Sequence, residues 1–123
     1  DPRDALGVLA AVGGFEIGGM AGAMLAAAAR CLPVVVDGFI CGAAALIACG
    51  LEPGAREYLI ASHQSVEAGH QAVLRHLGLR PIFNLDLRLG EGTGAALGIN
   101  LVEAAARILD EMATFGEAGV SEG

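Results

Sequence analysis

A glutamate flanked by glycines is the first residue in this sequence that could carry chemistry. Residues 88–96 are Arg-Leu-Gly-Glu-Gly-Thr-Gly-Ala-Ala, so Glu91 lies between Gly90 and Gly92. Glycines give a flat molecule close access to the backbone, and an accessible carboxylate can act as a general base. A carboxylate near a helix N-terminus can also serve only to interact with the helix dipole. The residues alone leave both interpretations open.

The same stretch matches the dinucleotide-binding pattern G-x-G-x-x-A from Gly90 to Ala95. That motif needs a further strand whose acidic end binds the ribose. Here the predicted helix that starts at Thr93 runs almost to the end of the chain. A dinucleotide-binding redox domain is therefore a minor alternative.

A second polar cluster, Ser62-His63-Gln64-Ser65, follows a predicted strand and opens a predicted helix. Hydroxyl and backbone N–H groups at this position can bind a phosphate, and Ser65 can also act as a simple N-cap. A hydrolase triad of Ser62, His63 and Asp37 is disfavoured because G-x-S-x-G is absent. Adjacent Ser and His side chains, moreover, need not face one another.

Glu67-x-x-His70 has the spacing of one half of a carboxylate–histidine metal motif. A di-metal bundle needs a second such motif on a facing helix, and the sequence contains none. We interpret the pair as part of a solvated helix face. We therefore predict no metal site and no cofactor.

Composition narrows the possible partners. Fourteen acidic residues face seven arginines, giving a net charge of −7, which argues against general nucleic-acid binding. The longest uncharged runs, residues 17–29 and 38–51, are shorter than the roughly 18–20 residues of a membrane-spanning helix. We predict a cytoplasmic protein with no membrane and no nucleic-acid partner. Cys31, Cys41 and Cys49 are expected to be buried, reduced thiols.

The pattern of apolar residues predicts an α/β chain. Strands are expected at residues 34–36, 57–62 and 82–89, and helices at 4–12, 15–30, 38–49, 65–77 and 93–114. This alternation predicts right-handed βαβ units and a parallel sheet. Ligands of such sheets bind beyond the carboxyl ends of the strands. That rule brings together Asp37-Gly38, Ser62-His63 and Gly90-Glu91.

Several stretches, in one order, resemble a single family, the nicotinate-nucleotide–dimethylbenzimidazole phosphoribosyltransferases. They are GGFEI (13–17), MAG (20–22), PVVVDGFI (33–40), YLIASHQS (58–65), Glu67, Gly69-His70, DLRLGEGTGAA (86–96) and EMATF (111–115). The resemblance implies transfer of the phosphoribosyl group of nicotinate mononucleotide to 5,6-dimethylbenzimidazole. The products are α-ribazole 5′-phosphate and nicotinate, within cobalamin biosynthesis.

The resemblance also implies where the site lies. It makes Glu91 the general base that removes a proton from the benzimidazole ring, and we expect this carboxylate to be partly buried. It implies that Leu89 and Gly90 line the benzimidazole pocket and that Ser62 and Ser65 lie near the phosphoribosyl group. Asp37 would orient the loop, and Gly92 would be a further substrate-binding residue. It further implies a homodimer built from a Rossmann-like parallel sheet and a smaller helical domain.

Two features of the family lie upstream of the matching region and are absent from this sequence: a G-I-G-N-T-T stretch and a second active-site glutamate. We therefore expect residues 1–123 to form roughly the C-terminal third of the enzyme, as part of a larger α/β domain. The last helix is expected to contribute to the small helical domain. The isolated segment is expected to be inactive, and a non-catalytic module that binds the base or the nucleotide is the alternative.

Overall fold

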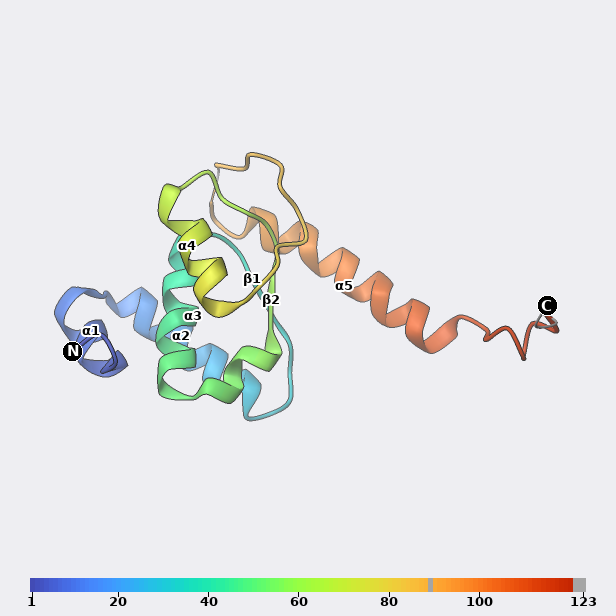
Figure 1. Cartoon of the computed structure of the whole chain (residues 1–123), viewed down its shortest axis with the longest axis horizontal. Helices are drawn as coiled ribbons and strands as arrows, with labels where there is room; N and C mark the ends of the chain where they lie inside the picture. Colours follow the sequence, from blue (N-terminus) through green and yellow to red (C-terminus); the bar gives the residue numbers. More distant parts are fainter. Residues whose placement is uncertain (89, 121–123) are drawn as a thin grey trace.

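Helices and short strands alternate along this chain, whose computed structural model describes residues 1–88 and 90–120. In order they are α1 (Ala5–Val12), α2 (Phe15–Ala28), β1 (Val34–Val36), α3 (Phe39–Leu51), the 3-10 helix η1 (Pro53–Tyr58), β2 (Leu59–Ala61), α4 (Ala68–Leu77) and α5 (Thr93–Glu111). Figure 1 shows α1–α4 and both strands gathered together, with α5 projecting away from them. The predicted mixed α/β class is confirmed.

The two strands form a parallel sheet in which Val34 lies opposite Leu59 and Val36 opposite Ala61. Three consecutive valines favour β1 because β-branched side chains fit an extended, pleated backbone. Parallel neighbours need a long crossover connection, which α3 and η1 supply. The carboxyl ends of both strands therefore point to the same edge.

The predicted third strand at residues 82–89 is wrong for the described part of that segment. Phe83 forms only an isolated parallel bridge with His63. Pairing goes no further because Asp86 has a φ of 52°, a left-handed conformation that an extended strand cannot contain. Leu89 lies outside the described residues. The alternating pattern of this segment belongs instead to a loop that runs along the end of β2.

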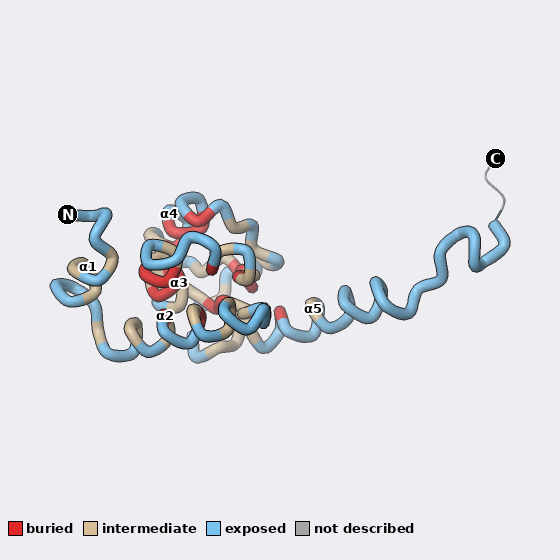
Figure 2. The backbone as a smooth tube through the Cα atoms, turned by 90° about the horizontal axis from the view of Figure 1, so that it is seen from below, coloured by how far each residue is buried: buried red, intermediate tan, exposed pale blue. Residues whose placement is uncertain are grey.

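The core lies between α2, α3, α4 and the sheet. Ala44, Ala45 and Ala48 of α3 are fully buried, and such small side chains let neighbouring elements pack closely against this helix. A Cβ atom at Gly69 of α4 would lie 2.8 Å from the ring of Phe39, so α4 also crosses α3 at short distance. Figure 2 shows the buried residues concentrated in α3 and α4, whereas α5 is mostly exposed.

Several helix ends differ from the prediction by one to three residues, and two of these differences have local reasons. Helix α2 ends at Ala28, not at residue 30, because Cys31 has a φ of 55°, and Cys31 is exposed where a buried thiol was expected. Helix α4 begins at Ala68, not at residue 65, because the preceding residues form a hydrogen-bonded turn around Ser65. Both changes place loops, rather than helix, beside the strands.

The exposed face of α5 carries ion pairs. Arg107 contacts Glu103 at 2.9 Å and Glu111 at 4.0 Å, one helical turn away on either side. Within residues 1–88 and 90–120, none of the helices combines the length and the apolar character needed to cross a bilayer.

Candidate functional site

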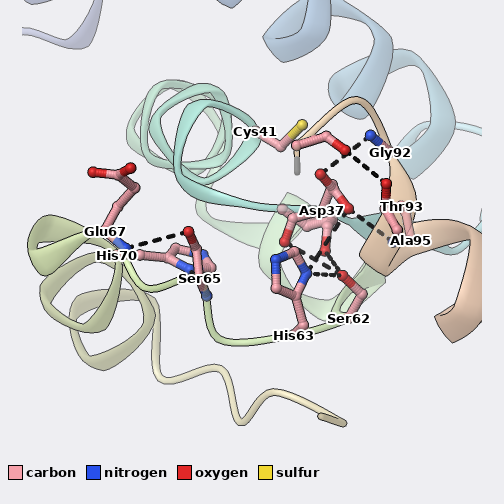
Figure 3. A network of polar contacts seen from close by, with 12 residues as sticks. Asp37, Cys41, Ser62, His63, Ser65, Glu67, His70, Gly92, Thr93 and Ala95 are labelled. Atoms are coloured by element: carbon pink, nitrogen blue, oxygen red, sulfur yellow. Dashed lines mark hydrogen bonds and ion pairs between the residues drawn. The ribbon is translucent and has the colours of Figure 1, made fainter. Parts of the chain in front are cut away.

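A cleft of about 630 Å³ opens at the carboxyl edge of the sheet. The segment after β1 contributes Asp37 and Gly38 to its walls, and the segment after β2 contributes His63 and Ser65. The turn of residues 90–92, which precedes α5, forms another wall. The structure thus brings together the three segments that strand order had placed at one edge (Figure 3).

Asp37 joins two of these segments. Its carboxylate accepts hydrogen bonds from the backbone N–H groups of Gly92, at 3.3 Å, and Ala95, at 2.9 Å. Gly92 is the N-cap of α5 and has no side chain, so Asp37 supplies the acceptor and the negative charge that a helix N-terminus favours. Asp37 is only 6% exposed and therefore fixes the start of α5 from inside the fold.

The turn that carries Glu91 has three consecutive residues with positive φ: 70° at Gly90, 57° at Glu91 and 79° at Gly92. A non-glycine residue in this region costs about 1–2 kcal/mol, and such strain is concentrated at functional sites. Glu91 is exposed at the rim of the cleft, so the expected partial burial is wrong for this chain. The physical reason is that the turn stands in open space, with no atom within 4 Å of a Cβ built at Gly90 or Gly92.

Ser62, His63 and Asp37 lie together but do not form a nucleophilic triad. His63 Nδ1 is 3.1 Å from Ser62 Oγ and 3.8 Å from the Asp37 carboxylate. In a triad the serine and the carboxylate bind opposite ring nitrogens, whereas here both face Nδ1. Ser62 is also fully buried, and its hydroxyl donates to the Val36 carbonyl oxygen at 2.8 Å.

The same contacts set the tautomer of His63. Because the Ser62 proton is directed to Val36, Ser62 Oγ acts as acceptor and His63 Nδ1 as donor. A Cβ atom at Gly94 would overlap the His63 ring, so the first turn of α5 lies directly on this side chain. His63 therefore links the end of β2 to the start of α5.

The pair Glu67 and His70 is not a solvated helix face. His70 is fully buried, and its Nδ1 accepts a hydrogen bond of 2.8 Å from the Ser65 N–H. Burial lowers the pKa of His70, and the nearby His63 lowers it further, although Asp37 partly opposes this shift. Only Glu67 meets the expectation, as an exposed side chain at the cleft. Within the described ranges, no group of three His, Cys, Asp or Glu residues is placed to bind a metal ion.

The predicted site residues thus occupy different positions. Gly90, Glu91, Gly92 and Ser65 line the cleft, as does Asp37. Ser62 lies beneath the surface, and Leu89 falls outside the described residues.

Sequence reasoning missed the apolar part of the lining, to which Met20, Phe39 and Leu87 contribute. Phe39 carried a usable signal, because it follows Gly38 just beyond the carboxyl end of β1. Met20 carried none, because α2 reaches the cleft only through tertiary packing. There Met20 lies 3.7 Å from the Cys41 sulfur, which also lines the cleft.

Known proteins match almost the whole length of this chain. The model of a family described as Phosphoribosyltransferase matches residues 1–120. The nicotinate-nucleotide–dimethylbenzimidazole phosphoribosyltransferase of Roseiflexus castenholzii is 69% identical over 121 residues, which are 98% of this chain and 34% of that protein. The protein of the same name from Geobacter sulfurreducens is 62% identical over 123 residues, or 100% of this chain and 35% of that protein.

A solved structure gives the same result. The crystal structure of nicotinate-nucleotide–dimethylbenzimidazole phosphoribosyltransferase from Thermus thermophilus superposes with a TM-score of 0.91 at 54% identity. The match covers 97% of this chain and 36% of that one. The chain thus spans about a third of the length of the relatives it matches. By sequence and by structure, it belongs to the phosphoribosyltransferase family.

Proposed function

We propose that this chain forms the part of a nicotinate-nucleotide–dimethylbenzimidazole phosphoribosyltransferase that carries the general base. The observation that carries the proposal is the position of Glu91. Glu91 is exposed and lines the cleft, on a turn whose other end is bound to the buried Asp37. A base in this position is accessible to a flat substrate and is attached to a rigid support.

The proposed reaction joins the phosphoribosyl group of nicotinate mononucleotide to 5,6-dimethylbenzimidazole. The pyridinium nitrogen of the nucleotide carries positive charge, so cleavage of its bond to the anomeric carbon releases nicotinate with a neutral ring. One imidazole nitrogen of the acceptor forms the new bond to that carbon. The other ring nitrogen loses its proton to the Glu91 carboxylate, which gives α-ribazole 5′-phosphate.

The lining of the cleft supports two kinds of contact. Met20, Phe39 and Leu87 offer apolar surface to the benzimidazole, and Gly90 and Gly92 leave space for its ring. We assign the phosphoribosyl group to the side of the cleft that Ser65 lines. Ser62 lies beneath the Ser65 side of the cleft, and Asp37 orients the turn of residues 90–92. Leu89 remains a proposed contact to the benzimidazole.

The wider organisation is also a proposal. We infer that residues 1–123 form the C-terminal part of a larger Rossmann-like domain, since two short parallel strands are too few to bury a sheet on both faces. Exposed apolar side chains on α5, among them Ile108 and Leu109, support further burial in a small helical domain or a homodimer. Three free cysteines suit the reducing cytoplasm.

The test is Glu91→Gln in the full-length protein, because glutamine keeps the shape and hydrogen-bonding reach of the side chain but cannot act as the base. We expect turnover to fall by about 10²–10⁴, with a much smaller change in benzimidazole affinity. Glu103→Gln on the exposed face of α5 is the matched control and should leave turnover near normal. If Glu91 served only the helix dipole, the variant would lose roughly 0.3–1 kcal/mol of stability and keep its turnover, and the general-base role would be rejected.

A further inference from the structure

The loop between β2 and α4 is held by a buried histidine to which the proposed chemistry gives no role. His70 Nδ1 accepts the Ser65 N–H at 2.8 Å, and the His70 N–H donates to the Glu67 carbonyl oxygen at 2.9 Å. The Glu67 N–H in turn donates to Ser65 Oγ at 3.3 Å. These three bonds close the turn of residues 65–70 around the imidazole, and Figure 3 shows Ser65, Glu67 and His70 close to one another.

The bond from Ser65 fixes the protonation of the ring. An N–H donor requires a lone pair on His70 Nδ1, so the ring proton resides on Nε2. Nε2 is fully buried and has no hydrogen-bond partner among the described residues. Leaving a buried donor unsatisfied reduces stability. Any stabilising hydrogen bond of this imidazole therefore comes from Nδ1, which holds Ser65.

The surrounding helices keep the ring in place. A Cβ atom at Gly42 of α3 would lie 3.4 Å from His70 Cδ2 and 3.0 Å from a methyl carbon of Val73. A larger residue at position 42 would displace one of them, so the absent side chain makes room for the imidazole. His70 thus packs against the core helix α3 and is bonded to the loop that lines the cleft.

Ser65 keeps a donor for a ligand. Its Oγ accepts the Glu67 N–H, while no acceptor for its own hydroxyl proton occurs among the described residues. The side chain lines the cleft, where that proton can reach an oxygen of a bound molecule. His70 holds the Ser65 backbone and the Glu67 N–H holds Ser65 Oγ, so protein contacts position this oxygen before any ligand binds.

We propose that His70 is a positioning residue of the transferase site, which holds Ser65 so that its hydroxyl donates to the phosphoribosyl group of nicotinate mononucleotide. This role rests on the proposed function. It makes His70 specific for one substrate, because the apolar side of the cleft where the benzimidazole is placed is formed by other elements.

The experiment compares variants of the full-length enzyme in steady-state kinetics with both substrates, together with thermal unfolding. Ser65→Ala measures the loss of affinity for nicotinate mononucleotide when the hydroxyl is removed. A lost hydrogen bond to a charged oxygen changes affinity by roughly ten- to a hundredfold. His70→Leu, which has no acceptor, should raise the KM for nicotinate mononucleotide by about tenfold and the KM for benzimidazole by less than about twofold. His70→Asn places an amide oxygen near Nδ1 and should restore most of the loss.

Two further variants keep the test decisive. Val73→Ala removes part of a buried core side chain on α4, so it should lower the melting temperature without changing the ratio of the two KM values. If His70→Leu does not fold, His70→Gln replaces it, because its amide lies one carbon further out and should fail to hold Ser65.

Equal changes in both KM values, or equal behaviour of the Asn and Gln variants, would overturn the role of His70. A wild-type enzyme without transferase turnover would instead overturn the proposed function, and this role with it.

Discussion

Gly94 is the position where a single methyl group tests how the site is assembled. It lies in the first turn of α5, and a Cβ atom there would overlap the ring of His63. One helical turn later, a Cβ atom at Gly98 would lie 3.1 Å from Ser62 Cβ and from a methyl carbon of Val35. The two glycines let the helix lie directly on the carboxyl ends of both strands.

The expected effect of Gly94→Ala follows from two opposing terms. Alanine stabilises a helix by about 1 kcal/mol relative to glycine, whereas an extra methyl group in a packed site typically costs about 1–3 kcal/mol. The His63 ring cannot move aside freely, because its Nδ1 is bound to Ser62 and faces Asp37. We expect a net loss of about 1–2 kcal/mol for Gly94→Ala and a value near zero for Gly98→Ala.

The assay is urea unfolding of the full-length protein, together with its turnover. Displacing the first turn of α5 also moves Glu91, so Gly94→Ala should reduce turnover by about tenfold or more, in line with the sensitivity of catalysis to small misplacements. Gly22→Ala in α2, where nothing lies within 4 Å, is the control and should be neutral or stabilising. A Gly94→Ala protein with wild-type stability and turnover would refute the packing of α5 on His63.

Three other changes probe the same arrangement. Asp37→Asn should destabilise the full-length protein by about 1.5–3 kcal/mol and lower turnover although Glu91 is intact, because an amide cannot accept both N–H bonds; unchanged urea unfolding would contradict the anchoring role. Because the pKa of His70 is lowered in the folded state, its contribution to the free energy of unfolding should be constant above the ordinary value of 6.5. That contribution should fall as pH drops below 6.5, by at most about 1.4 kcal/mol per pH unit. His70→Asn should remove this component from pH-dependent unfolding curves. The isolated chain of residues 1–123 should self-associate, because apolar side chains of α5 are exposed, and it should show no turnover. A monomer in light scattering at low concentration, or turnover by the isolated chain, would contradict this prediction.

The sequence predicted the features that arise from neighbouring residues. The valine run of β1, the crossover helix and the polar residues that follow β1 and β2 are local patterns, and all of them occur in the structure. The false strand at residues 82–89 shows the limit of such patterns. Alternation of apolar and polar residues says nothing about the left-handed backbone at Asp86 that ends the pairing.

The contacts that complete the site could not be predicted, because they join distant segments. Asp37 reaches Ala95 across 58 positions, and the fit of Gly94 over His63 depends on the path of a whole helix. His70 was interpreted as solvent-facing because of its pairing with Glu67, although its spacing of three, four and seven from Val73, Leu74 and Leu77 places it on the apolar face of α4. The packing of α4 on α3 encloses its ring.

The hydrogen bonds of Asp37 also distinguish this glycine-rich turn from a phosphate-binding loop. In a dinucleotide-binding loop of the form G-x-G-x-x-A, backbone N–H groups at the start of the helix face the pyrophosphate. In this chain the N–H groups of Gly92 and Ala95 are already bonded to the buried carboxylate of Asp37. A phosphate at that position would lack these donors and would be repelled by Asp37. The same two bonds instead hold the turn that carries Glu91, which supports our proposal that this residue serves as a base toward a flat nitrogen heterocycle.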